Sequence, residues 1–422
     1  MPRAAEQRAH LSAQGRRSSS AVSRVGESVK FRRYLAGVAS WFASFGMQVI
    51  LFPWLVAVVL RQPPGRVGLA QMSLMAPSIA LMLLGGAVAD RADCRTLLMR
   101  YHLLAALPPL ALAVVIASHS LGYGVLIVYG LAMGTLSALV IPARDALLTR
   151  VISNGLGRAV AVTTATQLMA QMLGIILAGS AGVVGAVSVL GAQAVTLTLG
   201  ALAVSQLSPA PSQVVHSDGE SRLAAMRDGL REAAGSARIR PVIIAMFAVG
   251  VFFVGAFIVL LPVLVRDAYG GGSAELSLVN MCFWGGTIVA TMTQVRLGVL
   301  RRAGRAMMLA LAGGAVVLAV ISVPGPLYGL VLLCFVWGVG AGVVMTQGRT
   351  IVQLAARDSH RARVLALFQL GLMGGAPIGA LVMGYLAGLV GPRPAAAYPA
   401  GAMILVLLFL LRRSGLWWQE AS

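Results

Sequence analysis

The sequence predicts an all-α membrane protein of about twelve transmembrane helices, arranged as two six-helix pseudo-repeat bundles. Of its 422 residues, 58% are hydrophobic and 11% are charged, and the mean hydropathy is +0.86. A soluble protein carries about a quarter charged residues. Apolar runs of bilayer-spanning length recur along the whole chain. Landmarks of the first half also return 205 residues later in the second half.

Each expected helix is an apolar run that ends at charged residues or at a Gly- or Pro-containing turn. In the first half these runs cover 34–60, 67–89, 96–117, 121–143, 159–182 and 186–206. In the second half they cover 241–265, 274–295, 306–323, 327–348, 363–388 and 395–411. We therefore expect an N-terminal six-helix bundle over 34–207 and a C-terminal six-helix bundle over 241–411.

The remaining segments are polar. Residues 1–33 are rich in Arg, Ser and Ala without apolar periodicity, which predicts a disordered basic cytoplasmic tail. Residues 412–422 are expected to form a second cytoplasmic tail. The stretch 208–240 opens with two prolines and continues with Leu223, Met226 and Leu230 at helical spacing. This pattern predicts a cytoplasmic linker that contains an amphipathic helix on the membrane surface.

The distribution of basic residues predicts the orientation. Cytoplasmic termini place all but four of the 33 Lys and Arg residues on the inner side; the exceptions are Arg61, Arg66, Arg266 and Arg393. We expect a multi-pass protein of the bacterial plasma (inner) membrane with both termini in the cytoplasm. The net charge of +20 does not indicate nucleic-acid binding, because the basic residues lie between apolar runs.

The repeat supports two related halves. The shift of 205 residues pairs Arg91 with Arg296, Arg144 with Arg349, Arg158 with Arg363, Gly174 with Gly379 and Gly179 with Gly384.

A charged turn follows the second expected span, where residues 85–95 read Gly-Gly-Ala-Val-Ala-Asp-Arg-Ala-Asp-Cys-Arg. Charge this dense beside membrane-length helices belongs at the water boundary. The turn resembles the loop between helices 2 and 3 of major facilitator superfamily transporters, whose pattern is Gly-x-x-x-Asp-Arg-x-x-Arg-Arg. The residues 92–94 depart from that pattern. The resemblance implies two bundles around a central cavity that rock to open on alternate faces.

Three further segments, 142–148, 260–267 and 362–379, are similar to twelve-helix exporters of the macrolide and enterobactin efflux type. The resemblance implies export but does not identify the cargo.

Charged residues at the inner helix ends are candidates for a conformational latch that closes the cytoplasmic side. The candidates are Gly86, Asp90, Arg91, Arg95, Arg144, Asp145, Arg349 and Arg363. The alternative is that they are solvated flanking charges that only fix the orientation. For Arg144 and Asp145 the two interpretations stand equal.

Small residues on the fifth and eleventh spans resemble the antiporter signature, and we expect a packed, flexing interface there. The residues are Gly174, Gly179, Gly375, Pro377 and Gly379. Generic glycine packing is the alternative.

Polar and aromatic residues within the spans are candidates for lining a mainly apolar cargo cavity. They are Phe45, Gln48, Gln167, Gln171, Phe253, Phe257, Asn280, Trp284 and Gln369. For each of them, contact with lipid or with another helix is the alternative.

The sequence predicts no enzyme, because the spans carry no His, Asp, Glu or nucleophile constellation. It predicts no metal site, no cofactor and no phosphate-binding loop for ATP hydrolysis. No acidic residue lies in mid-span, so proton coupling would have to use a boundary carboxylate among Asp90, Asp145, Asp267 and Glu275. Without such coupling, an anionic cargo or facilitated flux is required.

We therefore expect a secondary-active exporter of a small amphiphilic organic molecule, such as an antibiotic, siderophore or secondary metabolite. A lipid or lysolipid flippase of the same fold is the alternative. The expected partners are the lipid bilayer, the small-molecule cargo and, if transport is coupled, protons. The protein is expected to be a monomer and to bind no nucleic acid.

Overall fold

The computed structural model describes residues 29–91, 93–152, 156–207, 231, 234–297, 300–356 and 361–418. Within these ranges every regular element is helical, and eleven helices are long and apolar enough to cross a membrane. The second expected span forms a further helix of 28 residues, α2 (Pro64–Arg91). The all-helical membrane fold with about twelve spans is confirmed. The expected linker helix lies almost entirely outside the described residues, and so do residues 1–28 of the expected N-terminal tail. Residues 29–33 were expected to belong to the disordered tail, but they form the start of the first helix.

The first bundle begins with the helix Val29–Val59, whose last part is the π-helical segment η1 (Leu55–Val59). It is followed by α2 and by the other elements in chain order. These are α3 (Cys94–Ala117), α4 (Tyr123–Val151), α5 (Leu156–Gly179), the short α6 (Ala181–Val184) and α7 (Ala186–Ser205).

The second bundle begins with the long helix Ile239–Tyr269, which is interrupted by π-helical turns. Its parts are α9 (Ile239–Ala248), η2 (Val249–Val254), η3 (Ala256–Leu260) and α10 (Leu261–Tyr269). The remaining elements are α11 (Ser273–Leu297), α12 (Ala303–Ile321), α13 (Leu327–Ala355), α14 (Arg361–Val390), α15 (Pro392–Ala395), α16 (Ala397–Arg413) and η4 (Leu416–Trp418).

Two helices extend well past their expected ends. The apolar runs stop at residues 143 and 348, but α4 continues to Val151 and α13 continues to Ala355. Hydropathy marks the edge of the hydrocarbon layer, whereas the helix can continue into water with polar side chains. The charged residues Arg144, Asp145 and Arg349 therefore lie on helices and not in loops.

Glycines bring helices of the same bundle into backbone contact. A Cβ atom at Gly46 would overlap the carbonyl group of Gln171, and one at Gly174 would overlap that of Ala43, so α5 packs tightly on the first helix. In the second bundle, Cβ atoms at Gly375 and Gly379 would overlap the backbone of the long helix Ile239–Tyr269. These close approaches tie each pair of parallel helices together.

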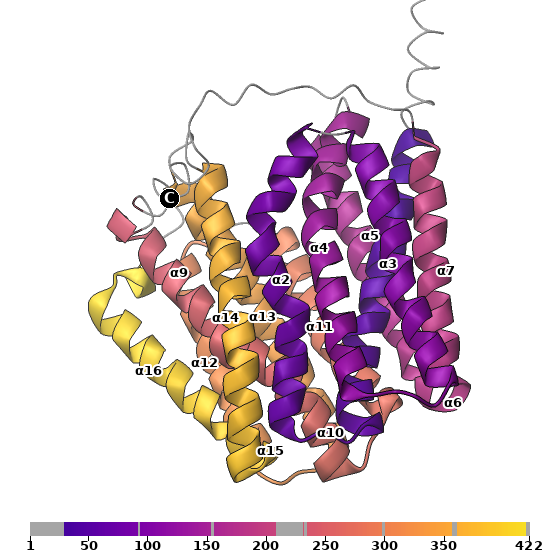
Figure 1. Cartoon of the computed structure of the whole chain (residues 1–422). Helices are drawn as coiled ribbons and strands as arrows, with labels where there is room; N and C mark the ends of the chain where they lie inside the picture. Colours follow the sequence, from indigo (N-terminus) through magenta and orange to yellow (C-terminus); the bar gives the residue numbers. More distant parts are fainter. Residues whose placement is uncertain are drawn as a thin grey trace, which may run out of the picture.

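Successive long helices alternate in direction, so the bundle has two ends. One end carries the turns after residues 59, 117, 179, 269, 321 and 390; we call it the arginine-poor end, because Arg61, Arg66, Arg266 and Arg393 lie there. Its elements α6, α10 and α15 lie at the bottom of Figure 1. The opposite, arginine-rich end carries the helix ends near residues 91, 151, 205, 297 and 355.

Candidate functional site

The two bundles are joined by hydrogen bonds where α5 crosses α11 at the arginine-poor end. The Ser273 hydroxyl donates to the Gly179 carbonyl oxygen over 2.9 Å and accepts from the Gly182 N–H over 2.9 Å. One turn further along α11, the Ser277 hydroxyl donates to the Ile175 carbonyl oxygen over 3.0 Å. Both serine residues are buried.

A second crossing, between α2 and α14, is made by glycines without a hydrogen bond of this kind. A Cβ atom at Gly384 would lie 2.7 Å from the Pro64 carbonyl oxygen and 3.1 Å from Cα of Gly68. Figure 1 shows α2 and α14 side by side at this level. The 205-residue shift relates Gly68 to Ser273 and Gly179 to Gly384. The same contact is therefore built twice, once with hydrogen bonds and once by backbone packing. We call the two crossings together the inter-bundle seal.

Arg266 links the bundles beside the seal. Its Nη1 donates to the carbonyl oxygens of Ala57 and Gln62, each over 2.7 Å, while Nε and Nη2 bind Asp267 over 2.5 and 2.8 Å. In the π-helical end of the first helix, Leu60 N–H donates to Leu55 and Gln62 N–H to Val56. The Ala57 carbonyl oxygen accepts from Arg266 at this helix C-terminus, where a cation is favoured.

Two more of the arginines that break the positive-inside pattern are held by loops at this end. Arg66 donates to the Gln62 side chain over 2.9 Å, and its guanidinium lies 5.5 Å from the Tyr123 ring centroid. The Arg393 guanidinium lies 5.0 Å from the Tyr269 ring centroid. Cation–π contact and hydrogen bonding account for these arginines as structural groups.

The charged turn at the arginine-rich end is described in part. Helix α2 contains Gly86 and continues to Arg91, but the structure does not describe the side chains of Asp90, Arg91 and Arg363. Asp93, a departure from the family pattern, caps α3 by accepting from the backbone N–H groups of Arg95 and Thr96, each over 3.2 Å. The Arg95 guanidinium donates to the Ser205 carbonyl oxygen at the end of α7.

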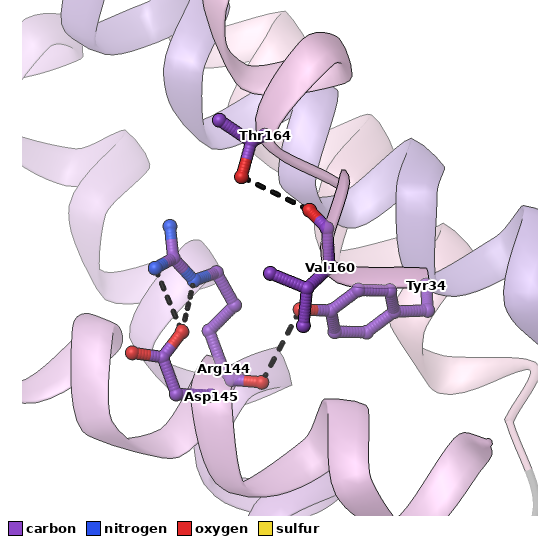
Figure 2. Close-up of polar contacts among 5 residues, drawn as sticks. All are labelled: Tyr34, Arg144, Asp145, Val160 and Thr164. Atoms are coloured by element: carbon purple, nitrogen blue, oxygen red, sulfur yellow. Dashed lines mark hydrogen bonds and ion pairs between the residues drawn. The ribbon is translucent and has the colours of Figure 1, made fainter. Parts of the chain in front are cut away.

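Arg144 and Asp145 form an ion pair near the same end (Figure 2), with 2.7 Å between Nη2 and Oδ1. The Arg144 side chain is 11% exposed and that of Asp145 is 61% exposed. The Arg144 guanidinium also lies 5.2 Å from the Phe42 ring centroid, and the Tyr34 hydroxyl donates to the Arg144 carbonyl oxygen over 3.4 Å. These contacts fasten α4 to the first helix, within one bundle. Arg349, the repeat partner of Arg144, is exposed on α13.

The cavity candidates fall into three environments. Gln48, Gln171, Phe253 and Asn280 are buried; Phe45, Gln167, Phe257 and Trp284 are partly buried; Gln369 is exposed on α14. Four aromatic residues, with Trp284 beside them, pack together in the second bundle. The ring centroids of Phe257 and Phe283 are 4.2 Å apart, and the Trp337 ring lies 5.7 Å from Phe283 and 5.8 Å from both Phe253 and Phe257.

Sequence reasoning missed Phe283 and Trp337. The Phe283 ring lies 5.7 Å from the ring of Trp284, which was a predicted cavity residue. Phe283 could have been predicted because it is the neighbour of Trp284 in the sequence. Trp337 lies on α13, far along the chain, and no spacing rule relates it to the aromatic residues of the seventh and eighth spans.

Alternating long helices in two related bundles, joined at one end by a seal, define a membrane transporter of the major facilitator type. The family described as Transmembrane secretion effector, within that superfamily, matches residues 28–421. The chain belongs to this family.

Solved structures of other transporters share the fold. The nucleoside transporter NupG is 14% identical and has a TM-score of 0.71, covering 91% of this chain and 98% of its own. An auto-inhibited peptide transporter of the POT family is 16% identical with a TM-score of 0.68, covering 92% and 100%. A bacterial homolog of the human lysosomal transporter Spinster, inward-facing and unoccupied, is 12% identical with a TM-score of 0.66, covering 92% and 95%. No curated protein matches the chain in a sequence comparison.

Proposed function

We propose that this protein is an exporter that carries a small amphiphilic organic molecule out of the cell by alternating access. The observation that carries the proposal is the position of the inter-bundle seal. The hydrogen bonds of Arg266, Ser273 and Ser277 join the two bundles at the arginine-poor end. The excess of basic residues supports a cytoplasmic position for the other end. With that orientation, the conformation described is closed toward the outside, which is a state that an exporter needs for taking up cargo from the cytoplasm.

The family membership supports the outward direction, because the family is described by secretion. The segments similar to macrolide and enterobactin exporters support an amphiphilic organic cargo, such as an antibiotic, siderophore or secondary metabolite. Proton coupling, if present, is proposed to use boundary carboxylates. Three of them lie at described helix ends: Asp145 is paired with Arg144, Asp267 is paired with Arg266, and Glu275 accepts from the Gly272 N–H over 2.6 Å.

The test is transport by the purified protein in liposomes with inserted molecules of known orientation. A macrolide, a catechol siderophore and a fluorescent lysolipid are loaded separately, with and without a pH gradient. We expect drug or siderophore to accumulate on the side facing the arginine-poor end. Accumulation of the lysolipid alone would favour the flippase, and movement in the opposite direction would contradict export.

The control is a variant that cannot open at the seal. A Cβ atom at Gly182 would lie 3.2 Å from the Ser273 Oγ, so the side chains at these two positions are close enough to be joined by a disulfide. The double variant Gly182→Cys/Ser273→Cys, with the three native cysteines replaced by Ala, should transport only after reduction. Transport that is the same in the oxidised and reduced protein, once the disulfide is verified, would show that opening at this crossing is not needed.

A further inference from the structure

Three buried polar atoms next to the seal have no hydrogen-bond partner: Gln171 Nε2, Asn280 Oδ1 and Trp284 Nε1. The Gln171 and Asn280 residues are only 5% and 4% exposed. A buried polar group without a partner is unfavourable, and native proteins satisfy nearly all of them. A molecule bound within two helical turns of the seal would supply partners for these three atoms.

The hydrogen bond between Ser277 and Ile175 shows where these atoms lie along α5 and α11. Helices α5 and α11 are antiparallel, because consecutive long helices alternate in direction. Gln171 lies one turn before Ile175 on α5, on the side of the arginine-rich end. Asn280 and Trp284 lie about one and two turns beyond Ser277 on α11, along the same stripe of that helix. All three residues therefore lie next to the seal, on the side of it that faces the arginine-rich end.

The chemistry of the three atoms is fixed. The Asn280 Nδ2 donates to the Leu276 carbonyl oxygen over 2.9 Å, which identifies Oδ1 as the acceptor left over. The indole nitrogen of Trp284 is a donor only, and the Gln171 Nε2 is also a donor. The level therefore offers two donors and one acceptor to an occupant.

Aromatic surface lies beside these polar groups. The Trp284 ring is 5.7 Å from Phe283, which in turn is 4.2 Å from Phe257 between ring centroids. Trp284 and Phe257 are only partly buried, so part of each side chain remains available for contact. Aromatic faces bind flat or apolar bodies, and they favour stacked or edge-on geometry.

Asp, Glu, Lys, Arg and His are absent from the sequence of the surrounding spans. The segments 34–60, 159–182, 241–265 and 276–295 contain no Asp, Glu, Lys, Arg or His. A formal charge on an occupant would lose its hydration without gaining a counter-charge, which is strongly unfavourable in a low-dielectric interior.

We propose that Gln171, Asn280 and Trp284 form the polar part of a cargo-binding site for an uncharged molecule. The occupant has a flat or apolar body and carries at least one hydrogen-bond donor next to an acceptor, as an amide or a hydroxy-ketone does. The donor pairs with Asn280 Oδ1, the acceptors pair with Gln171 and Trp284, and the body packs on the aromatic side chains. The identification of this occupant as cargo rests on the proposed export function.

The experiment measures binding by the full-length protein in lipid nanodiscs, with two dyes that share one ring system. The first dye is a neutral coumarin carboxamide, and in the second a trimethylammonium group replaces the amide. The variant Trp284→Phe removes one donor and keeps an aromatic ring. Its matched control is Trp418→Phe, because Trp418 is 77% exposed near the C-terminus, far from the site. The variant Asn280→Leu removes the acceptor.

We expect the wild-type protein to prefer the neutral dye. Trp284→Phe and Asn280→Leu should each raise its dissociation constant about threefold to tenfold, as expected for one lost hydrogen bond. Trp418→Phe should change nothing. The variant Asn280→Asp, studied at alkaline pH, places a carboxylate in the site and should reverse the preference in favour of the cationic dye. A variant that only disturbs folding would weaken both dyes and would not reverse the preference.

The proposal is overturned if the wild-type protein binds neither dye, if it binds the cationic dye as tightly as the neutral one, or if the variants at 280 and 284 bind as the wild type does. Flux of the neutral dye in liposomes separates this proposal from the proposed function. Binding that depends on these residues without flux contradicts export and leaves the site standing. Flux with an unchanged KM in all three variants contradicts the site and leaves export standing.

Discussion

Arg266→Gln should open the arginine-poor end, because it removes the guanidinium that joins the two bundles. The Nη1 atom of Arg266 donates to carbonyl oxygens of two residues in the other bundle, Ala57 and Gln62, each over 2.7 Å. The bond to Asp267 lies within one bundle and does not oppose opening. Only the two carbonyl contacts therefore contribute to the free energy by which Arg266 holds this end closed.

A hydrogen bond to a charged group contributes about 1.5–3 kcal/mol net, so two of them set a range of about 3–6 kcal/mol. The Arg266 side chain is 17% exposed, and water reaches it already in the closed state. We therefore use the lower limit, about 3 kcal/mol, which corresponds to a change of about 100-fold in the ratio of closed to open molecules.

The assay is the labelling of a buried cysteine from outside. Leu276 is 1% exposed at the seal, so Leu276→Cys in a background without the native cysteines reports opening. A membrane-impermeant maleimide should label the Arg266→Gln variant much faster than its parent. Arg61→Gln is the matched control, because Arg61 is an exposed arginine at the same end. If both variants are labelled at the rate of the parent, the link through Arg266 does not hold this end closed.

Three further predictions test other parts of the fold. Gly384→Leu should prevent closure at the arginine-poor end, because even a Cβ atom there would lie 2.7 Å from the Pro64 carbonyl oxygen. The Leu276→Cys reporter should then be labelled faster than in the parent. A labelling rate equal to that of the parent would contradict this prediction. Asp93→Ala should lower the free energy of unfolding by about 1 kcal/mol through loss of the α3 cap, seen as a lower Tm, whereas Asp93→Asn should lose much less. Arg144→Gln should loosen α4 from the first helix and lower the Tm, because it removes the ion pair with Asp145 and the contact with Phe42; an unchanged Tm would argue that the cluster has no structural role.

The expected spans agree with the helices because hydropathy over about 20 residues reports burial in a bilayer directly. The ends of α4 and α13 could not be predicted in this way, since a helix that leaves the membrane keeps its backbone hydrogen bonds while its side chains become polar. The sequence repeat predicted more than the number of helices, because it also paired equivalent positions in the two bundles. The pairing of Gly179 with Gly384 in the sequence marks the two crossings that the structure shows at one end of the molecule.

Contacts between side chains of helices that are distant in the sequence could not be predicted from the sequence. The sequence identified Arg266 as an exception to the positive-inside pattern, and its link to Ala57 depends on the π-helical end of the first helix. Similarly, Trp337 meets Phe283 only because Gly338 allows α13 to approach α11 in backbone contact. Both contacts result from helix geometry, which a pattern of residue types along the chain does not contain.

The two crossings of the seal differ in a way that affects how the protein opens. At the α5–α11 crossing, three hydrogen bonds involve Ser273 and Ser277; at about 0.5–1.5 kcal/mol each, they resist separation. At the α2–α14 crossing, Gly68 and Gly384 are in backbone contact, which forms only when both positions lack a side chain. The first crossing is therefore sensitive to the loss of a hydroxyl group, and the second to the gain of a methyl group.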